Sequence, residues 1–409
     1  MRITRRRFLA GAAAVGVGLN RDLQEAEGSS VPPVDPGPPP PDRFDPWVDV
    51  DPQALAFNVE TISGLVGRRP ILAVIKNNAY GLDLVPVGKV LEALPQVWGL
   101  AVVKTEAALA LKTAGIKKPV VLMALFGPTD GPELVTRGVD LCLTTDDAGD
   151  RVMAAVRGAP AGVVPRLHAY LDTGMSRMGV PHRRALAWME DLHRRGLRVA
   201  STFMGFTEDP EYDREQLRRF LRVADALRKE GVDPGLLHAA SSAAVYNFPD
   251  SHLDMVRPGL ALFGAYPSNE GREAAIAELR PALRLRARVV RVEEIRAGDS
   301  VSYNRNYMAE KPKWVATIPL GHSDGYPREA VDGARVLING ELYPPIGAVS
   351  ASHTVVELGD EPRARVGDVA TLVGPDHPEI HPNALATRTG RSVYDVLMHL
   401  SARMPRILS

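Results

Sequence analysis

From position 47 onward, short apolar segments alternate with longer segments in which apolar residues recur at helical spacing. The longer segments, such as 185–194 and 213–229, are rich in Ala, Leu, Arg and Glu, which favours amphipathic helices. We expect strands at 71–75, 97–103, 120–122, 141–144, 164–171, 199–203, 236–238 and 255–263. About eight such units over about two hundred residues fit a (β/α)8 TIM barrel better than an open sheet.

After about Pro281 the helical pattern stops. The strand-like runs that follow, punctuated by Gly, Asn and Pro, lie at 286–293, 314–319, 334–338 and 369–373. This change of pattern indicates a separate β domain. The predicted fold class is therefore α/β: a (β/α)8 barrel over 47–280, whose first strand can also pair with the β domain, and a C-terminal mostly-β domain over 281–409.

The N-terminus has the charged start and short apolar stretch of a signal peptide. Residues 4–9 read TRRRFL, and the mildly apolar residues 10–19 are too few to span a bilayer comfortably. Paired arginines before Phe-Leu resemble the twin-arginine signal, and an arginine-rich general secretory signal is the alternative. We expect a signal over 1–30, an extended Pro-rich linker over 31–46, and export, most simply to the periplasm. Since no clean cleavage site follows, an uncleaved anchor stays open.

Composition narrows the function classes. The 409 residues carry 49 Lys and Arg against 49 Asp and Glu, so the formal net charge is zero. Without a basic face, nucleic acid is not an expected partner, and a small-molecule substrate is favoured. The lone Cys142 can neither form an intramolecular disulfide nor offer zinc-ligand spacing, and we predict no metal site.

A single lysine ends the first barrel strand. Residues 73–81 read AVIKNNAYG, so Lys76 follows an apolar run and precedes a loop of small residues. A lysine at the mouth of a parallel barrel can form a Schiff base with a carbonyl cofactor, and apolar surroundings favour its neutral form. From this segment alone, a lysine in an ordinary loop is an equal alternative.

Further segments resemble one family in order and spacing. They read KNNAYG at 76–81, LDTGMSR at 171–177, HAASSA at 238–243, VRPG at 256–259, VSY at 301–303 and GHSDGYPR at 321–328. Together they are similar to alanine racemases and their broad-specificity relatives, which combine a barrel with a β domain and use pyridoxal 5'-phosphate. The match covers the chain from Trp47 to about Leu408.

The resemblance implies two catalytic groups on opposite faces of the substrate. Lys76 would bind the cofactor and act as one base, while Tyr303 would reach in from a second subunit as the other. Two such bases are what inversion at Cα requires. The implied partner is therefore a second copy of the chain, in a homodimer that shares its sites. The alternative for Tyr303 is an aromatic on a strand with its hydroxyl at the surface.

The resemblance also assigns the cofactor contacts. Arg257 would face the pyridine nitrogen, supported by His238, and a guanidinium there disfavours proton transfer to the ring; the alternative is an arginine in a surface turn. Arg177 would bind the substrate carboxylate. The phosphate would be held by Tyr80, Ser242, Gly259 and Leu260.

Several positions depart from the family pattern. Tyr170 replaces a lysine that often supports the substrate-binding arginine, and Phe203 replaces a histidine that contacts the site. Ala351 and Ser352 stand where the family has a Met-Asp pair that seats the carboxylate. We therefore expect Arg177 to be positioned differently in this chain.

Two further departures would widen the entrance. His322 replaces a tyrosine that narrows the mouth of the site, and Ala402 replaces another within SARMPR at 401–406. Losing two aromatic rings would open the site by tens to hundreds of cubic ångströms, on the scale of ligand pockets. We expect Ala351, His322, Ala402 and Arg177 to border the substrate, with a surface histidine as the favoured alternative for His322.

The predicted function is therefore racemisation of alanine and of larger amino acids, dependent on pyridoxal phosphate, by an exported dimer. The departures from the family pattern leave two alternative functions open. One is another reaction at Cα, such as decarboxylation, on the same fold. The other is an exported protein that binds the cofactor or an amino acid without catalysis.

Overall fold

The computed structural model describes residues 43–409. The predicted signal over 1–30 and the linker up to residue 42 lie outside this range. Among residues 43–409, no helix combines the length and the apolar character needed to cross a membrane.

The barrel is built on parallel strands joined by helices. Its hydrogen-bonded order is β2-β3-β4-β5-β6-β8-β9, and the short β7 branches from β6. The bounds are β2 Ile71–Val74, β3 Val97–Val102, β4 Val120–Leu122, β5 Asp140–Leu143, β6 Leu167–Asp172, β7 Val180–Pro181, β8 Val199–Phe203 and β9 Leu236–His238. These strands are apolar because helices cover the outside while side chains fill the inside.

The eighth position of the barrel is not a regular strand. Leu72 N–H donates to the Val256 carbonyl at 2.9 Å, and Asp254 N–H donates to the Leu237 carbonyl at 3.0 Å. Segment 254–258 therefore closes the ring between β9 and β2. The predicted strand over 255–263 is wrong, since Pro258 lacks an N–H and the chain turns into the 3-10 helix Leu260–Phe263. The predicted fold class, a barrel with a mostly-β domain, is confirmed.

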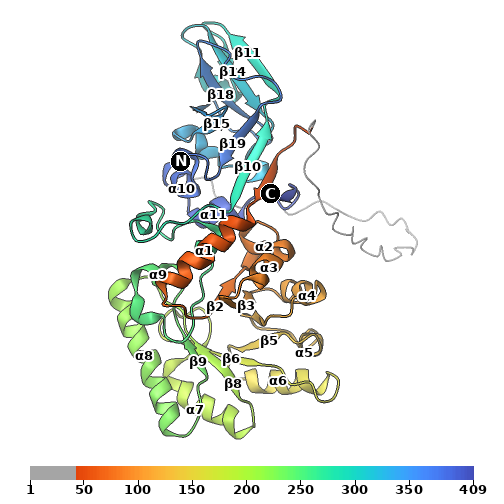
Figure 1. Cartoon of the computed structure of the whole chain (residues 1–409), viewed down its shortest axis with the longest axis vertical. Helices are drawn as coiled ribbons and strands as arrows, with labels where there is room; N and C mark the ends of the chain where they lie inside the picture. Colours follow the sequence, from red (N-terminus) through yellow and green to blue (C-terminus); the bar gives the residue numbers. More distant parts are fainter. Residues whose placement is uncertain (1–42) are drawn as a thin grey trace, which may run out of the picture. The chain divides into compact units, whose positions relative to one another are not determined.

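The barrel helices lie outside the strands (Figure 1). Their bounds are α1 Pro52–Leu65, α3 Leu84–Ala93, α4 Thr105–Thr113, α5 Gly131–Thr136, α6 Ala148–Arg157, α7 His182–Arg194, α8 Pro210–Lys229 and α9 Ser242–Asn247. Helix α8 begins earlier than predicted because Asp209 caps it, accepting from the N–H groups of Glu211 and Tyr212.

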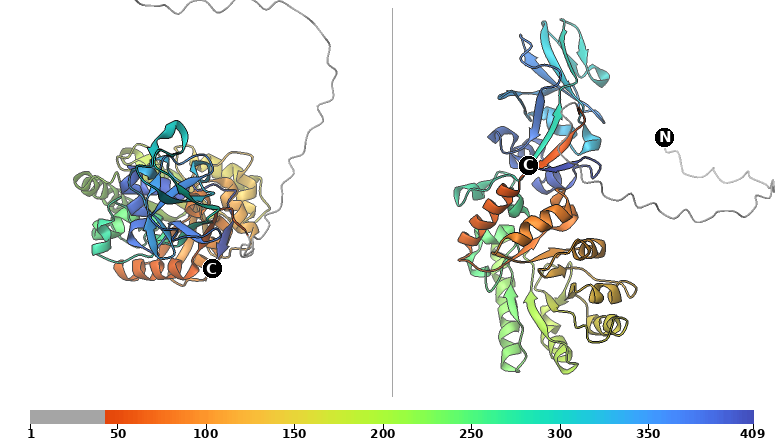
Figure 2. Two further views of the ribbon diagram at one scale, coloured as in Figure 1. Left: turned by 90° about the horizontal axis from the view of Figure 1, so that it is seen from above. Right: turned by 45° about the vertical axis from the view of Figure 1, so that its right-hand side comes forward.

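The first strand belongs to the β domain. Strand β1 (Trp47–Val50) is antiparallel to β10 (Leu283–Arg288) and parallel to β20 (Arg406–Leu408). Figure 2, right, shows this meeting of the red β1 with the blue C-terminus. The sheet order is β16-β15-β19-β10-β1-β20. Strand β1 thus belongs to the β domain, the barrel follows it in the sequence, and the C-terminal part of the chain completes the β domain.

Two smaller sheets complete the β domain, with orders β11-β14-β18-β17 and β12-β13. The remaining bounds are β11 Arg291–Ile295, β12 Ser300–Val301, β13 Tyr307–Met308, β14 Lys313–Ile318, β15 Val336–Ile338, β16 Glu341–Tyr343, β17 Pro345–Ile346, β18 Thr354–Gly359 and β19 Val369–Val373.

The expectation that helices stop after Pro281 is wrong. Helices α10 (Pro382–Thr389) and α11 (Val393–Met398) follow the last long strand. Each carries a local start signal: the His381 ring nitrogen caps α10, and the Ser392 hydroxyl caps α11. Both helices are shorter than three turns, so their periodicity is weak.

Candidate active site

Lys76 lies at the carboxyl end of β2 and opens a left-handed turn, α2 (Lys76–Tyr80). Asn77, Asn78, Ala79 and Tyr80 all have φ between 51° and 55°. For residues with a Cβ this conformation costs about 1–2 kcal/mol each, so other contacts must hold the turn. The left-handed turn directs the Tyr80 side chain back into the interior, where the residue is 3% exposed.

The C-terminal segment of the β domain holds this turn. Buried Arg406 donates from Nε to the Gly81 carbonyl at 2.8 Å and from Nη1 to the carbonyls of Ser401 and Met404 at 2.6 Å. A Cβ on Gly81 would lie 2.5 Å from the Leu397 carbonyl oxygen. The position of Lys76 therefore depends on residues more than three hundred positions away in the chain.

The predicted phosphate contacts meet in one cradle. The Ser242 hydroxyl accepts from the N–H groups of Gly259 (2.9 Å) and Ala261 (3.2 Å). The Leu260 N–H lies at the Tyr80 hydroxyl, and burial raises the pKa of that phenol far above its usual range. A Cβ on Gly259 would meet the Tyr80 hydroxyl at 2.2 Å, so only glycine fits. Hydroxyls and backbone N–H groups at the ends of barrel strands suit a phosphate.

Arg257 is buried and tightly bonded. Its Nη2 donates to the Met204 carbonyl at 2.5 Å, and its Nη1 donates to His238 Nδ1 at 3.1 Å. Burial lowers the Arg257 pKa to about 10, so the guanidinium stays charged at neutral pH. The same burial, with Arg257 beside it, lowers the His238 pKa well below its usual range. Arg257 is thus not an arginine in a surface turn.

The departures Tyr170 and Phe203 form an aromatic layer beside Arg257. The two rings stack at 4.5 Å, and Phe203 stacks on His238 at 5.1 Å. The Arg257 guanidinium lies 5.1 Å from the Phe203 ring centre. Phe203 therefore packs against His238 and Arg257 inside the barrel, although it cannot donate a hydrogen bond.

Lys76 shares its electrostatic environment with Arg177 and Glu208. Burial and then the Arg177 charge lower the Lys76 pKa, which favours the nucleophilic amine, while Glu208 opposes the shift. Burial and Asp213 raise the Glu208 pKa. Among residues 43–409, nothing forms a hydrogen bond or ion pair with the exposed Arg177, so its guanidinium is free to meet an anion at the mouth.

Sequence reasoning missed Glu208 and Tyr394. Burial, and then the Glu208 charge, raise the Tyr394 pKa to about 12. The Tyr394 ring lies 6.3 Å from that of Tyr80. Tyr394 comes from α11, which the pattern did not predict. Glu208 belongs to no recognised motif and lies five residues after Phe203.

The predicted entrance residues are joined by backbone contacts. His322 N–H donates to the Ser350 carbonyl at 2.9 Å, and Ser323 N–H donates to the Ala351 carbonyl at 3.0 Å. Ser401 N–H donates to the Asp324 carbonyl at 3.0 Å, which brings Ala402 to the same loop. His322, Ala351 and Ala402 therefore share one region. The His322 ring is bonded to Arg328 at 2.7 Å.

Tyr303 lies apart from these groups. Its side chain is 74% exposed, and the neighbouring Ser302, Asn304 and Arg305 all have positive φ. The hollow beside it is lined only by β-domain residues: Ser302, Ala348, Ser350, His353 and Val355. Within the described chain, Tyr303 does not lie against Lys76.

The barrel mouth fits pyridoxal phosphate. It offers an amine of lowered pKa, a phosphate cradle that a Cβ would fill, and a guanidinium whose Nε has no acceptor among the described residues. These match an aldehyde, a phosphate and a ring nitrogen. Among residues 43–409, no cluster of His, Cys, Asp or Glu is arranged for a metal ion.

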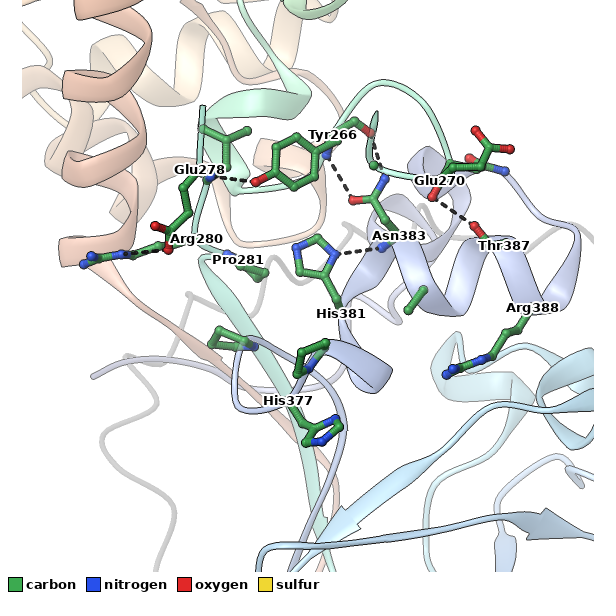
Figure 3. Close-up of a pocket in the computed structure, with 16 residues that line it drawn as sticks. Tyr266, Glu270, Glu278, Arg280, Pro281, His377, His381, Asn383, Thr387 and Arg388 are labelled. Carbon is green, nitrogen blue, oxygen red and sulfur yellow. Dashed lines mark hydrogen bonds and ion pairs between the residues drawn. The ribbon is translucent and has the colours of Figure 1, made fainter. Parts of the chain in front are cut away.

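A different cavity of about 580 Å³ lies where the barrel meets α10 (Figure 3). Its polar groups bond to one another: the Asn383 side chain accepts from Tyr266 N–H at 3.0 Å and donates to the Tyr266 carbonyl at 3.0 Å, and Arg388 pairs with Glu379. Burial lowers the His381 pKa to about 4, so it stays neutral. These contacts join the segment around Tyr266 to α10.

Comparison with known proteins identifies one family over most of the chain. The family model described as alanine racemase, N-terminal domain, matches residues 50–267, and the C-terminal domain model matches 282–408. The chain is 32% identical to the alanine racemase of Desulforamulus reducens over 369 residues, 88% of this chain and 98% of that protein. It is 31% identical to that of Symbiobacterium thermophilum, over 88% of this chain and 96% of that protein.

Solved structures give the same result. The alanine racemase of D-cycloserine-producing Streptomyces lavendulae is similar with a TM-score of 0.82 and 30% identity, over 90% of this chain and 97% of that one. The Bacillus anthracis alanine racemase with bound L-Ala-P has a TM-score of 0.79 and 30% identity, over 90% of this chain and 95% of that one.

Proposed function

The chain belongs to the alanine racemase family, and from this premise we propose how its own residues carry out the reaction. It is an isomerase that racemises amino acids with pyridoxal 5'-phosphate. The observation that carries the assignment of roles is the meeting of Lys76, Arg257 and the Ser242–Gly259 cradle at one end of the barrel.

Lys76 holds the cofactor and moves the Cα proton on one face. Tyr80, Ser242, Gly259 and Leu260 hold the phosphate, and Arg257 donates toward the ring nitrogen. When bound, the cofactor supplies the electron sink that makes the Cα proton acidic. Because the buried Arg257 keeps its own protons, it orients the ring without protonating it.

Tyr303 serves the opposite face of Cα from a second subunit. This proposal is supported by the 74% exposure of Tyr303, which lies on a strained loop and, among residues 43–409, forms no hydrogen bond with the barrel mouth. A homodimer with shared sites would bury this ring and bring the phenol to its partner's Lys76.

The substrate range extends beyond alanine. Ala402 leaves an exposed small residue beside the loop of His322, and the His322 ring is turned to Arg328. Arg177 binds the substrate carboxylate. We also propose that the protein is exported to the periplasm, on the basis of the arginine-rich N-terminus.

A chiral assay tests the function. Purified protein with pyridoxal phosphate is given separate L-Ala, L-Lys, L-Arg and L-Met, and the D-forms are measured. We expect D-products from all four. D-alanine alone would contradict the wide entrance, and decarboxylated products in place of D-amino acids would overturn the racemase assignment.

A further inference from the structure

A continuous series of hydrogen bonds crosses the barrel interior and ends on Arg257. Asp140 Oδ2 lies 3.2 Å from His168 Nε2, and His168 Nδ1 lies 2.6 Å from the Ser201 hydroxyl. That hydroxyl lies 2.8 Å from His238 Nε2, and His238 Nδ1 lies 3.1 Å from Arg257 Nη1. Side chains of opposite charge thus stand at its two ends.

When the Ser201 hydroxyl donates within the series, one set of donors and acceptors satisfies every contact. Arg257 can only donate, so His238 Nδ1 accepts and its proton lies on Nε2. His238 then donates to Ser201, and the Ser201 hydroxyl donates to His168 Nδ1. His168 in turn donates from Nε2 to the Asp140 carboxylate. In this arrangement each ring carries a proton on Nε2, and the two rings point the same way along the series.

Neighbouring strands contribute successive members. Asp140 opens β5, His168 is the second residue of β6, and Ser201 is the third residue of β8. His238 ends β9, and Arg257 follows in the segment that closes the ring. The series therefore rises from the amino ends of the strands to their carboxyl ends.

These groups share the inward face with the apolar filling of the barrel. Residues two apart on a strand share a face, so His168 accompanies Tyr170 and Ser201 accompanies Phe203. His168, Ser201 and His238 are each at most 1% exposed. Polar groups so buried cost stability unless bonded, and an unbroken series of this kind fixes the orientation of each member.

We propose that Asp140, His168 and Ser201 are positioning residues that fix the His238 tautomer and, through it, the place of the Arg257 guanidinium. The functional consequence rests on the proposed function, in which Arg257 faces the cofactor ring. Asp140, at the far end of the barrel, supplies the final acceptor, with Arg166 Nε 3.7 Å from its carboxylate.

Removing the Ser201 hydroxyl separates this role from simple packing. In Ser201→Ala the His238 Nε2–H loses its acceptor, so the proton can move to Nδ1 and confront the Arg257 N–H. A matched control is Thr202→Val, which also removes one buried hydroxyl from β8. The Thr202 hydroxyl donates to the Pro234 carbonyl at 2.6 Å, away from the series.

The first measurement is the 15N spectrum of ring-labelled histidines in the full apoprotein near neutral pH. We expect Nε2–H signals for His168 and His238 in the wild type and in Thr202→Val, and a mixed or Nδ1–H signal for His238 in Ser201→Ala. Ser201→Thr, which restores a hydroxyl, should restore the Nε2–H signal. If Ser201→Ala does not fold, Asp140→Asn replaces it. This change lies at the other end of the series and should still shift the His238 resonance.

The second measurement is the dissociation constant for pyridoxal phosphate. We expect it to rise about tenfold in Ser201→Ala and to stay within about twofold in Thr202→Val. Identical His238 tautomers and cofactor affinities in the two variants would overturn the proposal. Since the tautomers are read without cofactor or substrate, an absence of racemisation in the wild type would count only against the proposed function.

Discussion

The two halves of the candidate site are built differently. At the barrel mouth, Lys76 and Arg257 are buried or half-buried and are held by partners from the same chain. At the edge of the β domain, Tyr303 is 74% exposed on a loop with positive φ angles. One chain therefore preorganises the cofactor half, whereas Tyr303, the proposed second base, is not covered by any part of the described chain.

The strained turn after Lys76 shows how much the cofactor half relies on the chain's own contacts. Four left-handed residues are held by Arg406, which donates to carbonyls of the turn and of its own segment. The loop of Tyr303 is held by longer bonds at its two sides: the Ser302 hydroxyl donates to the Ala348 carbonyl at 3.3 Å, and Arg305 Nη2 donates to the Gly298 carbonyl at 3.2 Å. The Tyr303 ring itself stays exposed, which is the basis for proposing that a partner surface covers it.

The largest effect is expected from Lys76→Ala. Without the amine, the cofactor half loses its covalent attachment and one base, so kcat/KM should fall by at least about 10⁴-fold. Visible absorbance and a chiral assay measure both losses. Lys104→Ala is the control, because Lys104 also follows a barrel strand, β3, but lies exposed. Retained racemisation in Lys76→Ala would show that the reaction does not require Lys76.

The next effect tests where Tyr303 acts. Tyr303→Phe should lower kcat by about 10²–10⁴-fold and leave the cofactor affinity unchanged. Tyr307→Phe is the control, since the Tyr307 hydroxyl is bonded to Glu357 at 2.7 Å within the chain; it should affect stability rather than rate.

Mixed dimers of two inactive variants test whether Tyr303 acts on the site of the other subunit. Lys76→Ala and Tyr303→Phe subunits, refolded together, should recover roughly a quarter of wild-type activity, because half the dimers are mixed and each has one intact site. If the mixture stays as inactive as its parents, Tyr303 does not act across subunits.

The same division explains what the sequence could predict. The barrel strands follow from periodicity, so β4, β8 and β9 agree with their predicted bounds. The cofactor residues were expected from the family resemblance, and the structure brings them together at the strand ends. The eighth strand failed because Pro258 and Gly259 break a run that is apolar enough to be a strand. Helices α10 and α11 failed because they are too short for periodicity to decide.

Long-range contacts lay beyond the sequence. The approach of Tyr394 and Glu208 to the site depends on packing between segments almost two hundred residues apart. The stacking of Phe203 on Tyr170 was likewise invisible, although each departure was noted singly. Local patterns fix elements, whereas packing decides which of their side chains meet.

A smaller effect is expected at the entrance. Ala402→Tyr should restore bulk beside the His322 loop and lower kcat/KM for lysine and arginine by about 10–100-fold, with alanine changed only a few-fold. Ala402→Ser is the control for polarity without bulk. An equal loss for all substrates would mean that Ala402 affects the site as a whole and does not set its width.

The smallest effect concerns Glu208, whose negative charge raises the pKa of Lys76. Burial and Asp213 raise the Glu208 pKa above 4.5, so the folded apoprotein binds this proton more tightly than the unfolded chain does. The stability due to that proton is complete below pH 4.5 and is lost as pH rises through the raised pKa. As pH rises from 4 to 7, the Tm of Glu208→Gln should rise relative to that of the wild type, by no more than about 1–2 °C because Glu208 is an exposed residue. Glu294→Gln, on the exposed face of β11, controls for loss of one charge. A Tm difference that does not change with pH would mean that Glu208 titrates as it does in water, and its charge would then not weaken the nucleophilic form of Lys76.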